Sequence, residues 1–274
     1  MANKDVKFHK HTRKCGSIPK PALNPIATVN LQEKMHTLLP TLYEQTLAHT
    51  DGEVADYIPQ LADVNPELFA VSFCDLHGKT TNLGDHTYAF CLQSCCKPLN
   101  YCLARQLEAD TSNVHKHVGY EPSGRAFNEF VLNHDGLPHN PLINAGAIMV
   151  ASLLHPADEP STRFNAVQAF YQKLSGHSGA IGFDNGVFLS EKHHADRNIS
   201  LAYYMRENHA FDGYPTPSQL QDHLDLYYQC CSVTVTSSLG AVMAATLANR
   251  GVCPLNDERV VEPDVVKDAL SIMY

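Results

Sequence analysis

The sequence predicts an α+β protein, mostly helical, with one recognisable β-hairpin. An apolar run at Leu68–Cys74, turn residues at His77-Gly78-Lys79 and a second short run at Thr80–Leu83 indicate the hairpin. Beyond it, apolar residues recur at helical spacing in segments that are separated by loops rich in Pro, Gly and Asn. The fold class rests on this change of pattern.

Seven segments after the hairpin are expected to form helices. They are residues 96–109, 143–154, 163–174, 199–209, 218–231, 237–249 and 263–273. Glycine follows two of them, at Gly176 and Gly251, where a left-handed C-cap is expected. Ser218 and Pro263 suit the first residues of two others.

The segment before the hairpin is expected to begin as a basic arm and to continue as a helix. Residues 1–25 contain several lysines but no apolar core, which indicates a solvated arm rather than a secretory signal. Apolar residues in Leu31–Ala48 fall mostly at helical spacing, and Pro40 marks a break or a second helix start. Residues 26–274 are expected to form one domain.

The hairpin needs partners, because a lone two-stranded sheet is only marginally stable in water. Two further segments could supply strands, Tyr88–Leu92 and Arg259–Val261. Without them the sheet would keep an open edge.

Composition excludes several classes of protein. The 274 residues are 44% hydrophobic and 18% charged, which fits a globular chain rather than a disordered one. The net charge of −9 argues against nonspecific binding to nucleic acid, so a small molecule or another protein is the expected partner. No apolar run reaches the roughly 18 residues that a membrane span needs, so no membrane partner is expected.

The cysteines and histidines do not form a recognisable metal motif. Nine cysteines, two pairs of them adjacent at Cys95-Cys96 and Cys230-Cys231, do not suit a disulfide framework. They indicate reduced thiols in the cytoplasm, with the mitochondrial matrix as the alternative location. The sixteen histidines lack ligand spacing, so no metal and no cofactor is expected.

The sharpest local feature is Ser94-Cys95-Cys96-Lys97-Pro98. Pro98 belongs in the first turn of a helix, so the helix is expected to begin close to Ser94. The helix dipole there favours a developing oxyanion and should lower the pKa of Lys97, which lies on the same face as Ser94. A serine with a nearby lysine is one solution for acyl transfer. The structural alternative is an N-cap serine beside a solvated lysine.

The wider context resembles the serine-dependent glutaminases, a family that shares the β-lactamase and penicillin-binding-protein type of fold. The resemblance extends from about Leu31 to Met273, with its motifs in the family's order. The segments that carry it are Val54–Ala62, Phe90–Leu99, Glu121–Gly124, His139–Ile148, Ser190–Glu191, Asp196–Asn198, Leu224–Gln229 and Val242–Asn249. It implies a β-lactamase/transpeptidase-like fold, a helical cluster with an antiparallel sheet.

The resemblance implies hydrolysis of L-glutamine to L-glutamate and ammonia through an acyl-enzyme on Ser94. Lys97 would assist proton transfer, and Tyr57 would place a hydroxyl near the reacting centre. The residues that match substrate-binding positions are Ser94, Asn144, Glu191, Asn198 and Tyr227. Glu191 can accept from the α-ammonium of glutamine, whereas Asn144 and Asn198 can donate to its α-carboxylate. Family members usually form homo-oligomers.

Two of these residues also have purely structural interpretations. Asn144 could cap the helix that it begins. Glu191 could be a loop carboxylate that pairs with Lys192 or Arg197.

The two tyrosines have such interpretations as well. Tyr227 lies on a predicted helix and could be a core residue. Tyr57 could simply pack beside Pro59.

The resemblance stops before two elements of the family. Members continue past the segment that matches Leu270–Met273, with a second catalytic tyrosine and a Lys-Ser-Gly-Val-Gly-Gly strand that supplies an oxyanion-hole amide. The sequence ends at Tyr274, so the sheet's C-terminal strands are expected to be missing. We expect little glutaminase activity from this polypeptide alone. The alternatives are an inactive glutaminase-like subunit of a full-length relative, or an interaction protein.

Overall fold

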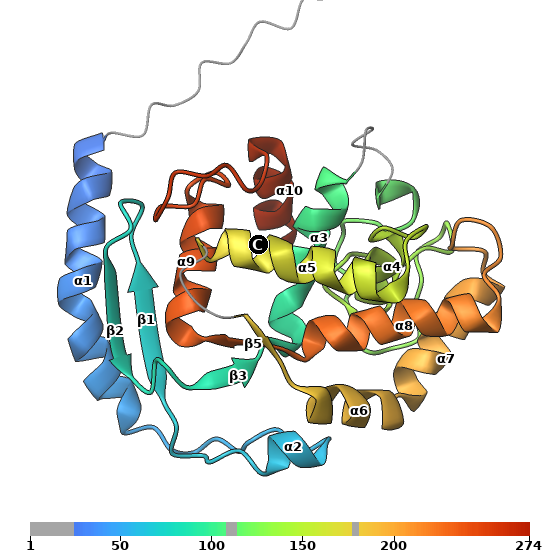
Figure 1. The fold of residues 1–274 in the computed structure, drawn as a ribbon, viewed down its shortest axis with the longest axis horizontal. Coiled ribbons are helices and arrows are strands. Elements are labelled where there is room, and N and C mark those ends of the chain that lie inside the picture. Colours follow the sequence, from blue (N-terminus) through green and yellow to red (C-terminus); the bar gives the residue numbers. More distant parts are fainter. Residues whose placement is uncertain (1–24, 108–113, 177–180) are drawn as a thin grey trace, which may run out of the picture.

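A computed structural model describes residues 25–107, 114–176 and 181–274 of the chain. The helices, labelled in Figure 1, are α1 (Pro25–Leu47), α2 (Pro59–Ala62), α3 (Cys96–Gln106), α4 (Asn144–Leu153), α5 (Pro160–Leu174), α6 (Asn185–His193), α7 (Asp196–Glu207), α8 (Pro217–Cys231), α9 (Ser237–Ala248) and α10 (Pro263–Met273). The strands are β1 (Ala70–Cys74), β2 (Thr80–Gly84), β3 (Ala89–Cys91), β4 (Gly182–Phe183) and β5 (Val233–Thr236). Short 3₁₀ turns occupy Gln93–Cys95 and Val114–Lys116.

The predicted hairpin is confirmed as β1 and β2, which pair antiparallel with Phe73 opposite Thr81. Asp75 shapes its turn, because one carboxylate oxygen accepts hydrogen bonds from the backbone N–H groups of His77 and Lys79, both at 2.9 Å. Gly78 has a φ of 81°, and a Cβ there would lie 2.6 Å from the carbonyl oxygen of Pro254. The turn therefore requires glycine for its conformation and for the space.

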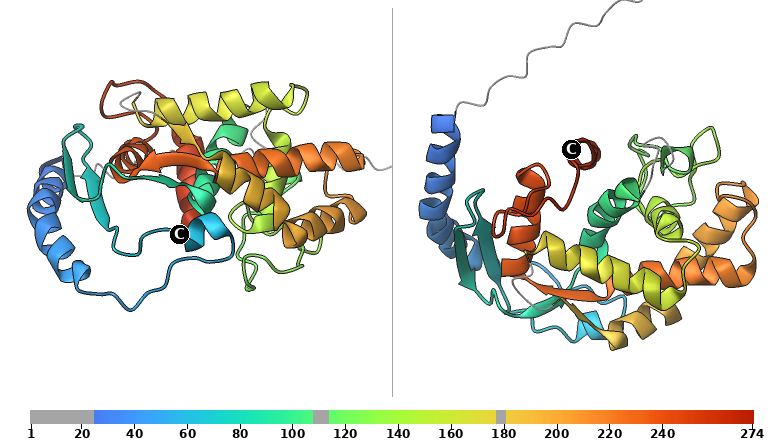
Figure 2. Two further views of the ribbon diagram at one scale, coloured as in Figure 1. Left: turned by 60° about the horizontal axis from the view of Figure 1, so that its bottom comes forward. Right: turned by 45° about the horizontal axis from the view of Figure 1, so that its top comes forward.

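Helices cover the hairpin on both sides, α1 on one face and α9 on the other (Figures 1 and 2). His36 of α1 contacts the hairpin through Nδ1, 2.7 Å from Oγ1 of Thr81, and through Nε2, 3.2 Å from Oδ2 of Asp75. One turn after Pro40, the ring of Tyr43 stacks on Phe69 with 5.3 Å between centroids.

The expected break at Pro40 is wrong, because α1 runs through it without interruption. Contacts of His36 and Tyr43 hold the helix to the hairpin on both sides of the proline. Pro40 itself is exposed, so the carbonyl that loses its helical partner can bond to water. The helix also begins at Pro25, before the expected start near Leu31, and the rest of the predicted basic arm lies outside the described residues.

A second, three-stranded antiparallel sheet has the order β3-β5-β4. Its strand β3 confirms that the segment Tyr88–Leu92 contains a strand, but this strand pairs with β5 and not with the hairpin, which keeps two strands. The other expected strand does not form, because Arg259 makes only an isolated bridge with Val252. The central strand β5 directly connects α8 to α9, and the sequence analysis missed it. Helix α6 was also missed, although Asp184 caps it by accepting from the N–H of Val187.

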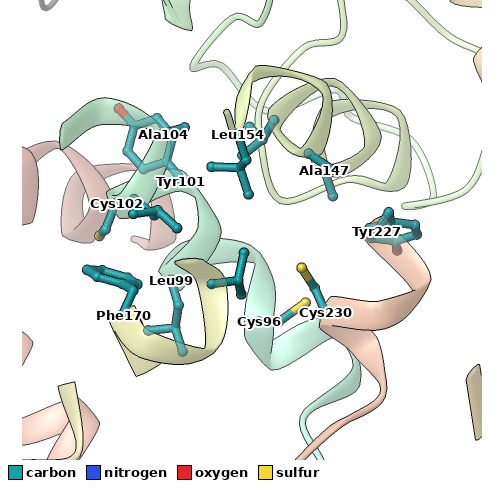
Figure 3. Close-up of a cluster of buried hydrophobic side chains, with 14 of the residues drawn as sticks. Cys96, Leu99, Tyr101, Cys102, Ala104, Ala147, Leu154, Phe170, Tyr227 and Cys230 are labelled. Carbon is teal, nitrogen blue, oxygen red and sulfur yellow. The ribbon is translucent and has the colours of Figure 1, made fainter. Parts of the chain in front are cut away.

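The seven predicted helices are confirmed, with ends that differ by up to three residues. Helix α3 packs against α4, α5 and α10. Figure 3 shows the buried cluster that side chains of α3 form with residues of α4, α5 and α8. The buried Asn100 of α3 is satisfied by the hydroxyl of Tyr171, which donates to Oδ1 at 2.6 Å. Burial of α3 on several sides fixes the place of its first turn, where the sequence predicts the nucleophile. None of the described helices is long and apolar enough to cross a membrane.

Candidate active site

The predicted nucleophile Ser94 lies on a tight turn between β3 and α3. The preceding residue, Gln93, has a φ of 48°, a left-handed conformation that costs a non-glycine residue about 1–2 kcal/mol. The turn leaves Ser94 exposed while its neighbours Leu92 and Cys96 are buried. Pro98 occupies the first turn of α3, as predicted. The sequence thus forms a strained turn that presents one hydroxyl at the start of a buried helix.

Lys97 is 4% exposed, and its Nζ donates a hydrogen bond to Oδ1 of Asn144 at 2.7 Å. It also lies 5.7 Å from the ring centroid of Phe127. Burial lowers the pKa of Lys97, because loss of water disfavours the ammonium. The sequence argument expected this direction but attributed it to the helix dipole, whereas desolvation is the main cause. Within the described residues, no hydrogen bond joins Lys97 to Ser94.

Asn144 links three helices. Besides accepting from Lys97 of α3, it donates through Nδ2 to Oδ1 of Asn198 on α7 at 3.1 Å. It does not cap α4, because the N-cap residue is Ile143 and no side chain bonds there. A Cβ at Gly146 would lie 1.8 Å from the carbonyl oxygen of Asn140, so glycine allows the preceding loop to pack on the first turn of α4.

Glu191 is 9% exposed and accepts a hydrogen bond from the hydroxyl of Tyr57 at 2.7 Å. It lies on α6, not in a loop, and it does not pair with Lys192, which bonds to Asp225 at 2.6 Å instead. Burial of the hydroxyl, followed by its bond to Glu191, raises the pKa of Tyr57 above its usual value. The phenol is therefore neutral, and packing beside Pro59 is not the whole of its role.

Tyr227 is 4% exposed, so its interpretation as a core residue is correct, but the same side chain also lines the cavity described next. Figure 3 shows it at the edge of the buried cluster, near Cys230. Burial, and then the thiol of Cys231, hold the pKa of Tyr227 well above its usual value. It can therefore act as a neutral hydroxyl donor.

These side chains line one cavity of about 380 Å³. Six of the seven predicted site residues border it, namely Tyr57, Ser94, Asn144, Glu191, Asn198 and Tyr227. Lys97 does not border it but contacts it through Asn144. Residues that are 170 positions apart in the sequence thus converge on a space suited to a small molecule.

The cavity also includes residues that the sequence analysis did not assign. Among them are Gln93, Phe127, His194, Arg197 and Cys231. Nε2 of Gln93 is buried without a hydrogen-bond partner, which leaves a donor at the cavity wall. In the sequence, Gln93 is adjacent to Ser94 and Arg197 is adjacent to Asn198. This adjacency to predicted site residues could have indicated that they border the cavity. In the part of the chain that the structure describes, no cluster of His, Cys, Asp or Glu could hold a metal ion.

Comparisons with known proteins agree with this geometry. The sequence model of the family described as "Glutaminase" matches residues 52–274. The chain is 49% identical over 233 residues to "Putative glutaminase 3" of Caenorhabditis elegans and 43% identical over 233 residues to "Glutaminase liver isoform, mitochondrial" of Mus musculus. Each alignment covers 85% of this chain but only 39% and 38% of those relatives, so the chain spans well under half of their length.

A similar solved structure is "Probable glutaminase ybaS", with a TM-score of 0.80 and 30% identity. The match covers 88% of this chain and 76% of that one. The solved glutaminases that the chain resembles have a β-lactamase-like fold, which confirms the predicted fold class. With the family's sequence model matching most of its residues, the chain belongs to the glutaminase family.

Proposed function

We propose that this site hydrolyses the side-chain amide of L-glutamine to L-glutamate and ammonia through an acyl-enzyme on Ser94. The observation that carries the proposal is the convergence of an exposed serine and a buried carboxylate on one small cavity, with a buried lysine bonded to Asn144 in the cavity wall. Family membership supports the same reaction.

In the first half-reaction, Oγ of Ser94 attacks the side-chain carbonyl carbon of glutamine. The bond to nitrogen breaks, and the hydroxyl proton of the serine ends on the departing nitrogen, which leaves as ammonia. Lys97 suits this transfer, because its lowered pKa increases the fraction of neutral amine that can accept a proton. Water then attacks the ester, and glutamate leaves as the serine regains its proton.

The neutral hydroxyls and amides suit binding of the amino acid. Glu191 offers an anionic acceptor to the α-ammonium, and Tyr57 orients that carboxylate by donating to it. Asn144 holds Oδ1 of Asn198, which leaves Nδ2 of Asn198 as a donor for the α-carboxylate.

The test is ammonia release from L-glutamine by the product of the protein's own gene, compared with the variant Ser94→Ala. Activity should fall at least 10³-fold, because the acyl-enzyme cannot form. Cys95→Ala is the matched control, since Cys95 is an exposed neighbour on the same turn. Activity that survives Ser94→Ala would refute the serine mechanism. The low activity expected of residues 1–274 alone stays a prediction, which the same assay tests.

We also propose that the protein forms homo-oligomers and that its compartment is the cytoplasm or the mitochondrial matrix. The name of the mouse relative places that protein in mitochondria. Light scattering after size-exclusion chromatography tests the first proposal, and microscopy of the tagged protein tests the second. A monomer at micromolar concentration would contradict the first.

A further inference from the structure

A second cavity, of about 340 Å³, lies away from the active cavity. It forms where the end of α4 and the start of α8 meet the loop that joins α7 to α8, on the right in Figure 1. The lining residues that matter for its chemistry are Ser152, Phe211, Asp212, Tyr214, Gln219 and His223. No residue that lines the second cavity also lines the active cavity, so the two are different sites.

The imidazole of His223 has no hydrogen-bond partner among the described residues. Its Nδ1 is buried without one, and no hydrogen bond to either ring nitrogen shifts its pKa. Burial, followed by the positive charge of Arg163, lowers the pKa of His223 to about 4, so the ring is neutral near pH 7. A neutral imidazole has one N–H donor and one acceptor nitrogen. Leaving them unpaired destabilises the fold, a cost that a ligand in the cavity can offset.

Aromatic rings form part of the wall. The ring of Phe211 lies nearly parallel to that of His223, at 20° and with 6.1 Å between the centroids. The guanidinium carbon of Arg206 lies 4.2 Å from the ring centroid of Tyr214, which holds this second ring beside the cavity. Flat aromatic walls favour a planar aromatic ligand that can stack on them.

Two further side chains give the cavity a donor and an acceptor. Oε1 of Gln219 accepts from the backbone N–H of Thr216 at 2.9 Å as part of the capping box of α8, which leaves Nε2 as a donor for a ligand. The hydroxyl of Ser152 donates to the carbonyl oxygen of Met149 at 2.6 Å, so its oxygen can still accept. Donor and acceptor thus lie in the same wall as the imidazole.

The charges around the second cavity favour a neutral ligand. Among the described residues that line it, only Asp212 carries a formal charge. Its side chain is 82% exposed and lies 3.3 Å from Nε2 of His117. Arg163 does not line the cavity, and its Nε and Nη2 donate to the carbonyl oxygens of Leu154 and Ala151, both at 2.8 Å. Neither charge is directed at a ligand.

We propose that the second cavity binds an uncharged purine base, either free or as part of a nucleoside. Proteins bind such bases by stacking them on aromatic side chains and by forming hydrogen bonds with the donors and acceptors at their edges. The rings of Phe211 and Tyr214 suit the stacking, and the imidazole of His223 and the amide of Gln219 suit the edge. The two fused rings of a purine fill more of a 340 Å³ cavity than one pyrimidine ring would. The proposal does not depend on the proposed glutaminase reaction.

Titration calorimetry of the protein with adenine, adenosine and indole tests the proposal. Adenine or adenosine should bind with a dissociation constant of about 10–500 µM, a range usual for a ligand of this size. Indole has a similar shape but no acceptor nitrogen, so it should bind at least about 10-fold more weakly. Tighter binding of adenine indicates the free base, and tighter binding of adenosine indicates the nucleoside. No binding of either at about 5 mM, or equally tight binding of indole, overturns the proposal.

His223→Phe keeps an aromatic ring but removes both nitrogens, so it should weaken binding at least about 10-fold. Because it also removes an unpaired buried polar atom, its melting temperature without ligand should be no lower than that of the unmodified protein. His86→Phe is the matched control, since Nδ1 of His86 is also buried without a partner but His86 does not line the second cavity. This control should bind as tightly as the unmodified protein.

Gln219→Glu is a second variant that does not rely on the first. A glutamate keeps the oxygen that accepts from Thr216 in the capping box but has no N–H donor, so α8 should remain and binding should weaken at least about 10-fold. Gln45→Glu, at an exposed position of α1, adds the same charge away from the cavity and should bind normally. Full affinity in His223→Phe or in Gln219→Glu, in whichever variant folds, overturns the proposal.

Discussion

Nζ of Lys97 donates a hydrogen bond to Oδ1 of Asn144 over 2.7 Å, which joins the first turn of α3 to the first residue of α4. Nδ2 of Asn144 continues the link to Asn198 on α7. The bond fixes where the buried amine lies, and burial lowers the pKa of Lys97 because loss of water disfavours the ammonium.

Changing Asn144→Asp should therefore impair the lysine. A carboxylate beside the amine favours the ammonium form and raises the pKa of Lys97, so the neutral base forms only at higher pH. We expect kcat to fall about 100-fold near neutral pH and the alkaline rise of the pH–rate profile to move to higher pH. The control is Asn128→Asp, which adds the same charge to the cavity lining without a hydrogen bond to Lys97. It should leave the alkaline rise of the pH–rate profile at its original pH. An unshifted profile in Asn144→Asp would count against Lys97 as the base.

Changing Tyr57→Phe should weaken substrate binding rather than folding. The variant removes the hydroxyl that donates to Glu191 at 2.7 Å, but 55% of the tyrosine is exposed, so little packing is lost. We expect the KM for glutamine to rise about tenfold with an unchanged melting temperature. Tyr88→Phe, at a tyrosine of similar exposure that does not border the cavity, is the control. An unchanged KM would show that the Tyr57 hydroxyl is not needed for Glu191 to bind the substrate.

Changing Asp75→Asn should alter stability in a pH-dependent manner. Burial acts to raise the pKa of Asp75, but the backbone N–H groups of Lys79 and His77, together with His36, outweigh it and hold that pKa below its usual value. The folded state thus favours the carboxylate. Its contribution is present above the unfolded-state pKa of about 3.9 and is lost as the pH falls through the lower folded-state value.

Urea unfolding at several pH values measures this effect. At pH 7 the free energy of unfolding should be about 1–2 kcal/mol lower in Asp75→Asn than in the unmodified protein. The difference should shrink as the pH falls from about 4 through the lower folded-state pKa of Asp75, because the carboxylate of the unfolded chain binds its proton first. Asp51→Asn, at an exposed loop aspartate, should show no such difference. A gap that widens towards acid pH would contradict the assignment.

Changing Asp268→Asn should weaken the packing of α10 on α3, the helix that follows the predicted nucleophile. Arg105 of α3 is 5% exposed and donates to Asp268 of α10. The substitution removes a charge partner of a buried guanidinium, so we expect a loss of about 1–3 kcal/mol of unfolding free energy, towards the low end because a third of the Asp268 side chain contacts solvent.

The control for this variant is Asp264→Asn, at an exposed position on the same helix. It should cost less than about 1 kcal/mol, the usual effect of one acidic residue in a first helical turn. Equal losses in the two variants, measured by urea unfolding, would show that the Arg105–Asp268 pair contributes nothing specific.

Local sequence patterns predicted most elements of the fold. The hairpin is visible because Gly78 and its neighbours form a turn between two apolar runs, and the main helices are visible because their apolar residues recur at the helical period. Strand β5 was missed because its four residues are too few for a clear pattern between two helices. Pro40 misled the prediction because contacts with the hairpin outweigh its local cost.

For the site, the short spacing Ser-x-x-Lys drew attention to Ser94 and Lys97 but was not decisive by itself. The resemblance of several motifs to the glutaminase family supplied the polar residues that the structure brings to the cavity. Only the tertiary structure decided their partners. Tyr57 and Glu191 are separated by 134 residues, and Lys97 and Asn144 by 47, so their contacts depend on how α3, α4 and α6 pack. Burial then lowers the pKa of Lys97, since desolvation is a property of the folded core and not of the helix that carries the lysine.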